Sequence, residues 1–250
     1  MNSDNVAPIH LAVQYLAAAG ISFLVKQEDD SHTNLGYSPD LGQIYTRPLN
    51  DKGDQLLLDL NDFSLKWRSD IFTEEIELHS RTHKEVLAWI SNVTDKAGLR
   101  NAFKYQFHYE LPYEIKDDYI FNVPSEILER ERHLRSLTHN VLAAVLETHG
   151  LESEIRIWPH HFDSGAFSHF PAKDIAVGLG LAIPDQLVDD YYYYISGYKG
   201  HQSFVPQGAG SLPIGSWKTE GFTGAILPAT DRTPTDVKAF FGETISKYRN

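Results

Sequence analysis

The 250-residue sequence predicts an α+β fold in which helices pack on the outer faces of antiparallel sheets. Two patterns predict this class. Apolar residues recur at helical spacing in four segments, and several short segments alternate between apolar and polar residues as half-buried strands do. A third observation is that the order helix, glycine, strands, helix occurs twice along the chain. Two equivalent halves favour one pseudo-symmetric domain with its helices packed against the sheets.

Each of the four predicted helices has its own boundary pattern. The first is expected to end at Gly20, which suits a left-handed cap. The second begins at Thr82 with Glu85 three residues later, as in a capping box, and the fourth begins at Thr233 with Asp236 in the same place. The third carries a Glu/Arg run over 126–135, interpreted as a solvated side with helix-spaced ion pairs. The predicted helices cover residues 7–19, 82–97, 125–148 and 234–248.

The strands are predicted from period-two alternation between turn residues. Residues 21–25, directly after Gly20, are expected to form a buried strand. The clearest alternation runs from Phe103 to Leu111 and predicts a half-buried antiparallel strand. The Gly/Pro-rich stretch 197–215 is long for a loop in a compact domain. The remaining strands are expected at 43–47, 55–60, 63–67, 72–79, 154–157, 174–183, 191–196 and 222–227.

The twofold order of elements is interpreted as a divergent duplication within a single domain. The halves are about 1–100 and 125–250, joined by a strand-containing connection over 101–124. Helices starting at Thr82 and Thr233 are expected to be equivalent. Plain residues in the first half stand where the second half has histidines, an aspartate and four tyrosines. The fold alone therefore does not require the polar groups, and a polar, aromatic cleft is expected in the second half.

Composition excludes several classes of function. The 22 basic residues against 34 acidic ones give a net charge of -12, which disfavours binding to nucleic acid. The sequence contains no cysteine, so disulfides, thiolate zinc sites and cysteine nucleophiles are absent. No apolar run approaches the roughly 20 residues of a membrane span, and no signal peptide is recognised at the amino terminus. A soluble, cytoplasmic protein of bacterial type, with no membrane or nucleic-acid partner, is expected.

The strongest candidate for a site is the segment 155–165, which combines imidazoles, a carboxylate and large aromatic rings. If it continued as a strand, His161 and Asp163 would point to one side and the neighbouring aromatic groups to the other, although Pro159 favours a bend. A small organic ligand, ring-bearing or sugar-like, is the leading expectation. The candidate binding residues in this segment are Trp158, His160, His161, Phe162 and Asp163.

The tyrosine run is the second part of the predicted cleft. Tyr191 and Tyr193 should oppose Tyr192 and Tyr194 on a strand. Tyrosines form a wall that stacks on a ring and offers hydroxyl groups, although half-buried packing is an equally ordinary role for them. A face of small residues could provide the floor of the cleft. These small residues are Ala176, Gly178, Gly180 and Ala182.

Other functions stay open from the sequence, including whether the protein is an enzyme. His161 and Asp163 with His169 would suit zinc or iron, and with His160 they could serve a metal-dependent hydrolase or lyase. A His-Asp pair could equally act as a general base with its orienting partner. The structural alternative is that Asp163 hydrogen-bonds a histidine and ties down a loop. An interaction domain that docks a partner through 197–215 is a further alternative.

The segment Trp158-Pro159-His160-His161-Phe162-Asp163 resembles a bacterial family of domains of unknown function. The tyrosine-rich strand ending at Tyr198 and the segment 222–228, which ends in Leu-Pro before the last helix, are similar to later parts of that family. The resemblance extends over the whole chain and is most specific from Trp158 to Asp163. It implies no activity, and no catalytic role is carried over from it.

Overall fold

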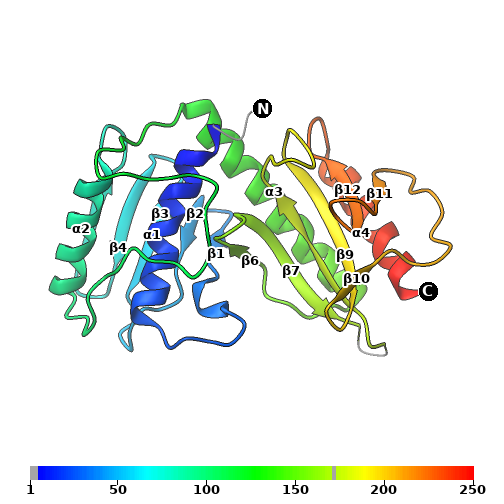
Figure 1. Cartoon of the computed structure of the whole chain (residues 1–250), viewed down its shortest axis with the longest axis horizontal. Helices are drawn as coiled ribbons and strands as arrows, with labels where there is room; N and C mark the ends of the chain where they lie inside the picture. The colour runs from blue at the N-terminus through cyan, green and yellow to red at the C-terminus, as the bar shows by residue number, and fades with distance from the viewer. Residues whose placement is uncertain (1–4, 171–172) are drawn as a thin grey trace. The chain divides into compact units, whose positions relative to one another are not determined.

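A computed structural model describes residues 5–170 and 173–250, and it confirms the α+β class (Figure 1). The described residues form four α-helices and two antiparallel sheets. They divide into two compact units, each of which is described by itself. The N-terminal unit holds the described residues up to Ser136 together with Ile157–Phe162. The C-terminal unit holds Leu137–Arg156 and Asp163–Asn250.

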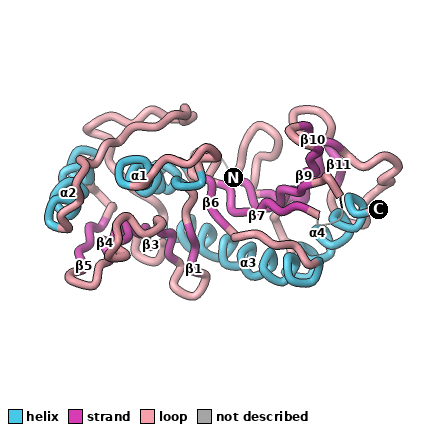
Figure 2. Tube along the Cα trace, turned by 90° about the horizontal axis from the view of Figure 1, so that it is seen from below, coloured by secondary structure: helices cyan, strands magenta, loops and turns pink. Residues whose placement is uncertain are grey.

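The N-terminal unit contains a five-stranded meander in which each strand pairs with the next along the chain. Leu56, Leu58 and Trp67 point from one face into the core. Helices α1 (Ala7–Phe23) and α2 (His83–Lys96) lie on that side of the sheet (Figure 2). The strands are β1 (Gly36–Ser38), β2 (Gln43–Tyr45), β3 (Gln55–Asp59), β4 (Ser64–Arg68) and β5 (Thr73–Glu77).

The predicted strand over 21–25 is wrong, because α1 continues through Gly20 to Phe23. Gly20 has a different purpose from the cap expected of it. A Cβ atom there would lie 2.8 Å from the carbonyl oxygen of His32 in the short 3-10 helix η2 (Ser31–Thr33). Glycine is thus needed for a close approach between helix and turn. The proposed match between 21–25 and the strand after Gly150 is lost with it.

The predicted strand from Phe103 to Leu111 is also wrong as a paired strand, although exposure alternates residue by residue as expected. Residues 103–113, here called the strap, lie along α1 and pair with no strand among the described residues. The Phe103 ring lies 6.4 Å from the Phe23 ring, and the Tyr109 hydroxyl donates to Gln14 Oε1 at 2.7 Å. Packing against a helix has therefore taken the place of a strand partner.

The predicted helix starts are confirmed in detail. Thr82 and Thr233 each accept a hydrogen bond from the backbone amide three residues on, and Glu85 and Asp236 each accept one from the backbone amide of the cap residue. Both boxes satisfy amide groups that a helix start leaves unpaired. The duplication itself stays a prediction, since the two sheets differ in strand number and order.

The C-terminal unit is built on strands β7 to β12 of a seven-stranded sheet, in the order β11-β12-β9-β8-β7 with β10 paired to β9, and Ile157 and Trp158 of β6 belong to the N-terminal unit. One face packs on α4 (Pro234–Arg249), where the Tyr193 ring meets the Phe241 ring at 6.0 Å. The second half of α3 (Ser125–His149) lies on the same side as α4 (Figure 2). The strands are β6 (Arg156–Trp158), β7 (Asp163–His169), β8 (Ala176–Ala182), β9 (Tyr192–Lys199), β10 (Gln202–Phe204), β11 (Ser216–Lys218) and β12 (Gly224–Pro228).

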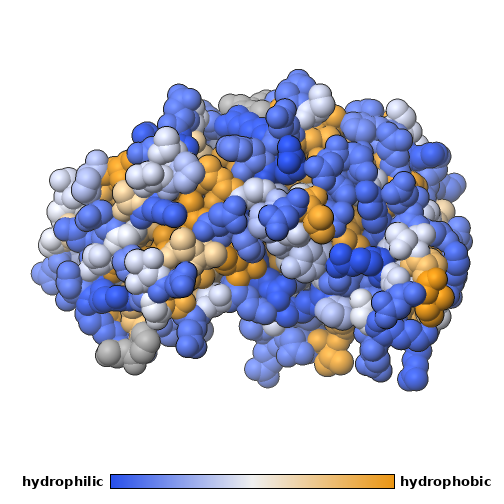
Figure 3. Space-filling view, turned by 180° about the vertical axis from the view of Figure 1, so that it is seen from behind, coloured by the Kyte–Doolittle hydropathy of each residue, from blue (hydrophilic) through white to orange (hydrophobic). Residues whose placement is uncertain are grey.

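The side of the molecule that faces away from the viewer in Figure 1 is mostly hydrophilic (Figure 3). Apolar residues show there among charged and polar ones, in keeping with the acidic composition. No helix in the described part of the chain is long and apolar enough to cross a membrane.

Candidate functional site

The candidate site is the face of the C-terminal sheet that points away from α4, here called the aromatic face. Side chains of residues directly opposite each other on paired strands share a face. Gly178 stands opposite Phe167 on β7 and Ser196 on β9, so its neighbours at every second position lie on this face too. The face consists of Asp163, Gly165, Phe167 and His169 on β7, Ala176, Gly178, Gly180 and Ala182 on β8, and Tyr192, Tyr194, Ser196 and Tyr198 on β9.

The tyrosines divide between the two faces as their alternation predicts. Tyr193 is fully buried on the α4 side, and Tyr191 is buried just before β9. Tyr192 and Tyr194 lie on the aromatic face beside Ala182 and Gly180. Only two of the four predicted binding tyrosines therefore stand beside the small-residue stripe.

The two glycines of this stripe serve different purposes. A Cβ atom at Gly180 would lie 2.2 Å from the carbonyl oxygen of Ser164 and 2.9 Å from Cα of Gly165, so the backbone of β7 passes too close for any side chain. A Cβ atom at Gly178 would meet only the rings of Phe167 and Tyr198, both at 3.5 Å. Gly180 is required by strand packing, whereas Gly178 is the part of the predicted floor that borders open aromatic rings.

One end of the aromatic face is closed by packed side chains. Ala182, Tyr192 and Ile226 form a small buried cluster. The Tyr192 hydroxyl donates to Asp185 Oδ2 at 2.7 Å, and the Tyr194 hydroxyl bonds to the Asp163 carboxylate. Burial raises the pKa of both phenols, and the nearby carboxylates raise it further. The phenols at this end therefore stay protonated and donate to the carboxylates.

The other end of the aromatic face is open. Phe167 lies in β7 beside Gly178 of β8, and the residue is 45% exposed. Its ring centroid lies 5.7 Å from that of half-buried Tyr198 and 5.6 Å from that of exposed His169. These three residues, here called the platform, present ring surfaces beside Gly178. Phe167 and Tyr198 are absent from the predicted binding residues. Phe167 lies four residues after Asp163, so strand alternation would place both side chains on the same face.

The segment from Trp158 to Phe162 forms a tight turn, so the alternation expected of a continuing strand does not apply. The amide of Phe162 donates to the carbonyl of Trp158 at 2.7 Å, and Phe162 takes a left-handed φ of 60°. Its ring is fully buried and lies 3.8 Å from the Arg135 guanidinium carbon. Arg135 also donates to the Phe162 carbonyl at 2.9 Å. Phe162 therefore anchors the turn and lines no open cleft.

Arg135 and Glu131 correct the interpretation of the Glu/Arg run as wholly solvated. Both side chains are buried and form an ion pair one helical turn apart on α3. Burying two charges is tolerated when each also has hydrogen-bond partners, as Arg135 has at Phe162. Helical spacing places both on the buried side of α3, because Glu131 comes four residues after Ile127 and Arg135 seven after Leu128, but their charge is typical of solvated positions.

Helix α1 holds the same turn from another side. His10 Nε2 lies 2.7 Å from the carbonyl oxygen of Pro159, and Gln14 Nε2 donates to that oxygen at 2.8 Å. The His10 ring also stacks on the Phe162 ring at 5.3 Å. Burial lowers the pKa of His10 to about 4, so this imidazole is neutral at pH 7. On the α1 side the turn is thus held by neutral hydrogen bonds and ring packing.

The two histidines of the turn are less enclosed. His161 is exposed and His160 half-buried, and their ring centroids are 4.4 Å apart. Trp158 is half-buried as well. Burial lowers the pKa of His160 to about 4, and the neighbouring His161 contributes in the same direction. The His160 imidazole is therefore neutral at pH 7, and on a fixed turn it can exchange hydrogen bonds with a ligand.

The predicted metal set of His161, Asp163 and His169 is not brought together. Asp163 and His169 occupy the two ends of β7, and six strand residues span roughly 20 Å. Metal ligands stand within about 2.0–2.6 Å of their ion. Within the described residues, no group of three or more His, Asp or Glu side chains is placed to hold a metal ion.

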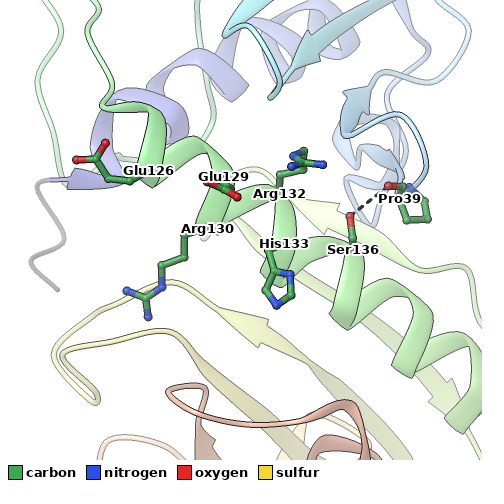
Figure 4. A pocket seen from close by; sticks show the side chains of 7 residues that line it. All are labelled: Pro39, Glu126, Glu129, Arg130, Arg132, His133 and Ser136. Atoms are coloured by element: carbon green, nitrogen blue, oxygen red, sulfur yellow. Dashed lines mark hydrogen bonds between the residues drawn. The ribbon is translucent and has the colours of Figure 1, made fainter.

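A hollow of about 460 Å³ lies along the first turns of α3 (Figure 4). The Ser136 hydroxyl donates to the carbonyl of Pro39 at 3.2 Å across it. Glu126, Arg130 and Arg132 point in different directions, so the charged groups do not converge on one point. Its lining residues are Pro39, Glu126, Glu129, Arg130, Arg132, His133 and Ser136. This surface resembles the solvated side of a helix more than a binding site.

No family model, curated protein or solved structure matches this chain. The function therefore has to be inferred from the chemistry of the aromatic face.

Proposed function

We propose that the protein binds a small organic ligand with a planar or sugar ring at the open end of the aromatic face. The observation that carries this proposal is the exposure of Phe167, a large apolar residue of β7, beside the rings of Tyr198 and His169. Aromatic rings are favourable stacking surfaces, and covering an exposed phenylalanine removes apolar area from water. A ring-bearing ligand that stacks on Phe167 would remove this apolar area from water.

The neighbouring polar groups favour a ligand with hydrogen-bonding substituents. The His169 imidazole can donate or accept a hydrogen bond at the rim of the platform. Further along the same face, Tyr194 and Asp163 hold a phenol and a carboxylate in a fixed pair. A mostly apolar surface with a few placed polar groups is typical of small-molecule sites.

The proposal is tested by saturation-transfer NMR on the full chain with a panel of methyl glycosides, nucleosides and indole. Phe167→Ala removes the central ring of the platform, and we expect about a tenfold loss of affinity for any compound that binds. Leu41→Ala is the matched control. Its side chain is 54% exposed in the N-terminal unit, and its removal should leave binding unchanged.

A second variant tests the floor. Gly178→Leu places a side chain against the rings of Phe167 and Tyr198, where a ligand would stack, and should abolish binding. Circular dichroism establishes that each variant is folded. The proposal is wrong if no compound in the panel binds, or if the bound compound keeps its affinity in both folded variants.

A further inference from the structure

The strap is the most strand-like segment of the chain that has no strand partner. Lys104, Gln106, His108 and Glu110 are exposed, and the aromatic residues between them are half-buried. This strict alternation is typical of a strand with one face on the core. In Figure 1 the strap crosses in front of α1, and in Figure 2 it lies on the outer side of that helix.

The main chain of the strap bonds to the Ser22 hydroxyl at Lys104 and has few partners among the described residues beyond that point. In the described part of the chain, residues 107–112 make no backbone–backbone hydrogen bond. The amide of Gln106 bonds locally to the carbonyl of Lys104 at 3.0 Å, and the chain bends at His108 and Tyr109. An extended edge with unpaired amides and carbonyls is a template for pairing with another strand.

The strap sequence is complementary to itself in the antiparallel direction. It reads Phe-Lys-Tyr-Gln-Phe-His-Tyr-Glu-Leu from 103 to 111, so Phe107 is its centre. Antiparallel pairing about this centre sets Lys104 opposite Glu110 of the other strand and Tyr105 opposite Tyr109. Opposite charges and paired aromatic rings at facing positions stabilise antiparallel strands. Both ends of the strap gain a Lys–Glu pair in this arrangement.

We propose that the strap is a homodimer interface, in which two copies of the chain pair their straps antiparallel about a twofold axis at Phe107. A twofold interface brings the same surface of both copies together, so it requires a self-complementary segment. The exposed charges favour a second copy of the chain as the partner, because Lys104 and Glu110 of one copy lie opposite Glu110 and Lys104 of the other. Pairing straightens the bend at His108 and replaces the local Gln106 bond with hydrogen bonds between chains.

Disulfide cross-linking tests the register, because the chain has no cysteine of its own. Lys104→Cys and Glu110→Cys alter exposed side chains, and the proposed register places the two residues opposite each other. Facing Cα atoms on paired strands are about 4.5–5.5 Å apart, which suits a disulfide. Mixed and oxidised, the two variants should form a covalent heterodimer. Each alone should stay uncross-linked, because its two copies stand roughly 20 Å apart along the strands.

Phe107→Cys gives an independent test, since this residue faces its own copy and should cross-link in a single variant. Charge reversal tests the same interface without oxidation. In sedimentation velocity over a concentration series, Lys104→Glu should weaken dimerisation about tenfold, and adding Glu110→Lys should restore it. A wild-type chain that stays monomeric throughout the series overturns the proposal. So does a dimer that fails to cross-link at 107 and at the 104–110 pair.

Discussion

The two sheets each bury one face under helices, and their other faces are strongly different. On the N-terminal sheet several charged residues gather on the outward face. Lys66 Nζ lies 3.0 Å from Asp59, 2.9 Å from Asp62 and 3.8 Å from Glu75. On the C-terminal sheet the corresponding face holds glycines, tyrosines and the half-exposed Phe167.

The comparison separates what the fold needs from what it does not. A charged outer face is the ordinary cover of an antiparallel sheet, because it is well solvated and discourages association. The aromatic face leaves a large apolar ring in water and places Gly178, which strand packing does not require, within β8, where a glycine weakens the strand. Features that lower stability without serving the fold are expected where a protein binds something.

The largest effect that would sharpen this comparison concerns the two glycines. Gly180→Val should destabilise the protein by about 3 kcal/mol or more, because its side chain meets the backbone of β7, which cannot move aside cheaply. Gly178→Ala should stay within about 1 kcal/mol of wild type, since its Cβ makes ordinary contacts and alanine restricts the unfolded chain. Denaturant unfolding of both variants provides the measurement. Equal losses would show that the whole stripe is a packing feature and weaken the case for a floor.

An intermediate effect is expected on the charged face. Lys66→Met leaves Asp59, whose side chain is 6% exposed, with hydrogen bonds from Gln43 and Asn61 only. We expect a loss of about 1–2 kcal/mol at pH 7, because a buried charge loses one of its compensating partners. Exposed Asp62→Asn is the control and should change stability by less than about 0.5 kcal/mol.

The pH dependence of this loss has a definite sign. Burial pushes the pKa of Asp59 upward, but the hydrogen bonds from Gln43, Asn61 and Lys66 outweigh it and hold the pKa below its ordinary value. The folded state therefore binds fewer protons than the unfolded chain. The stabilisation is complete above the unfolded pKa of about 4 and is lost as the pH falls through the lower folded value. The difference between wild type and Lys66→Met should shrink at pH 3, and a constant difference would assign the loss to packing alone.

Local patterns predicted much of the fold, and long-range packing decided the rest. The capping boxes at Thr82 and Thr233 were predictable because their hydrogen bonds lie within one turn of sequence. The role of Gly20 is not predictable from its own helix, because the His32 carbonyl that it approaches belongs to a separate segment. The packing of the strap on a helix is not predictable either. Alternation indicates a half-buried extended chain, but it does not specify whether a strand or a helix lies beside it.

The candidate site was predictable only in part for the same reason. The tyrosine alternation and the small-residue stripe both follow from strand period two. Phe167 and Tyr198 meet over Gly178 only because of the register of β7, β8 and β9, which the sequence does not specify. Arg135 stands at helical spacing from the buried Leu128, but its charge is typical of a solvated position, and the Phe162 ring that it packs on comes from a separate segment. The turn was expected to be functional, yet its best-defined contacts anchor it.

The smallest effect expected is also the one that tests Asp163, the one binding residue predicted in the segment 155–165 that lies on the aromatic face. Asp163→Asn removes a charge but keeps an oxygen that can accept from the Tyr194 hydroxyl, so stability should change by no more than about 1 kcal/mol. The pKa of Tyr194 should fall, because a negative neighbour is lost, while burial still holds it above its ordinary value. Absorbance titration of the tyrosines measures this shift. Asp185→Asn beside Tyr192 is the matched control, with the same phenol–carboxylate bond at the closed end. If Asp163→Asn instead loses 3 kcal/mol or more while Asp185→Asn does not, Asp163 is a structural anchor, and binding on this face must rest on the platform alone.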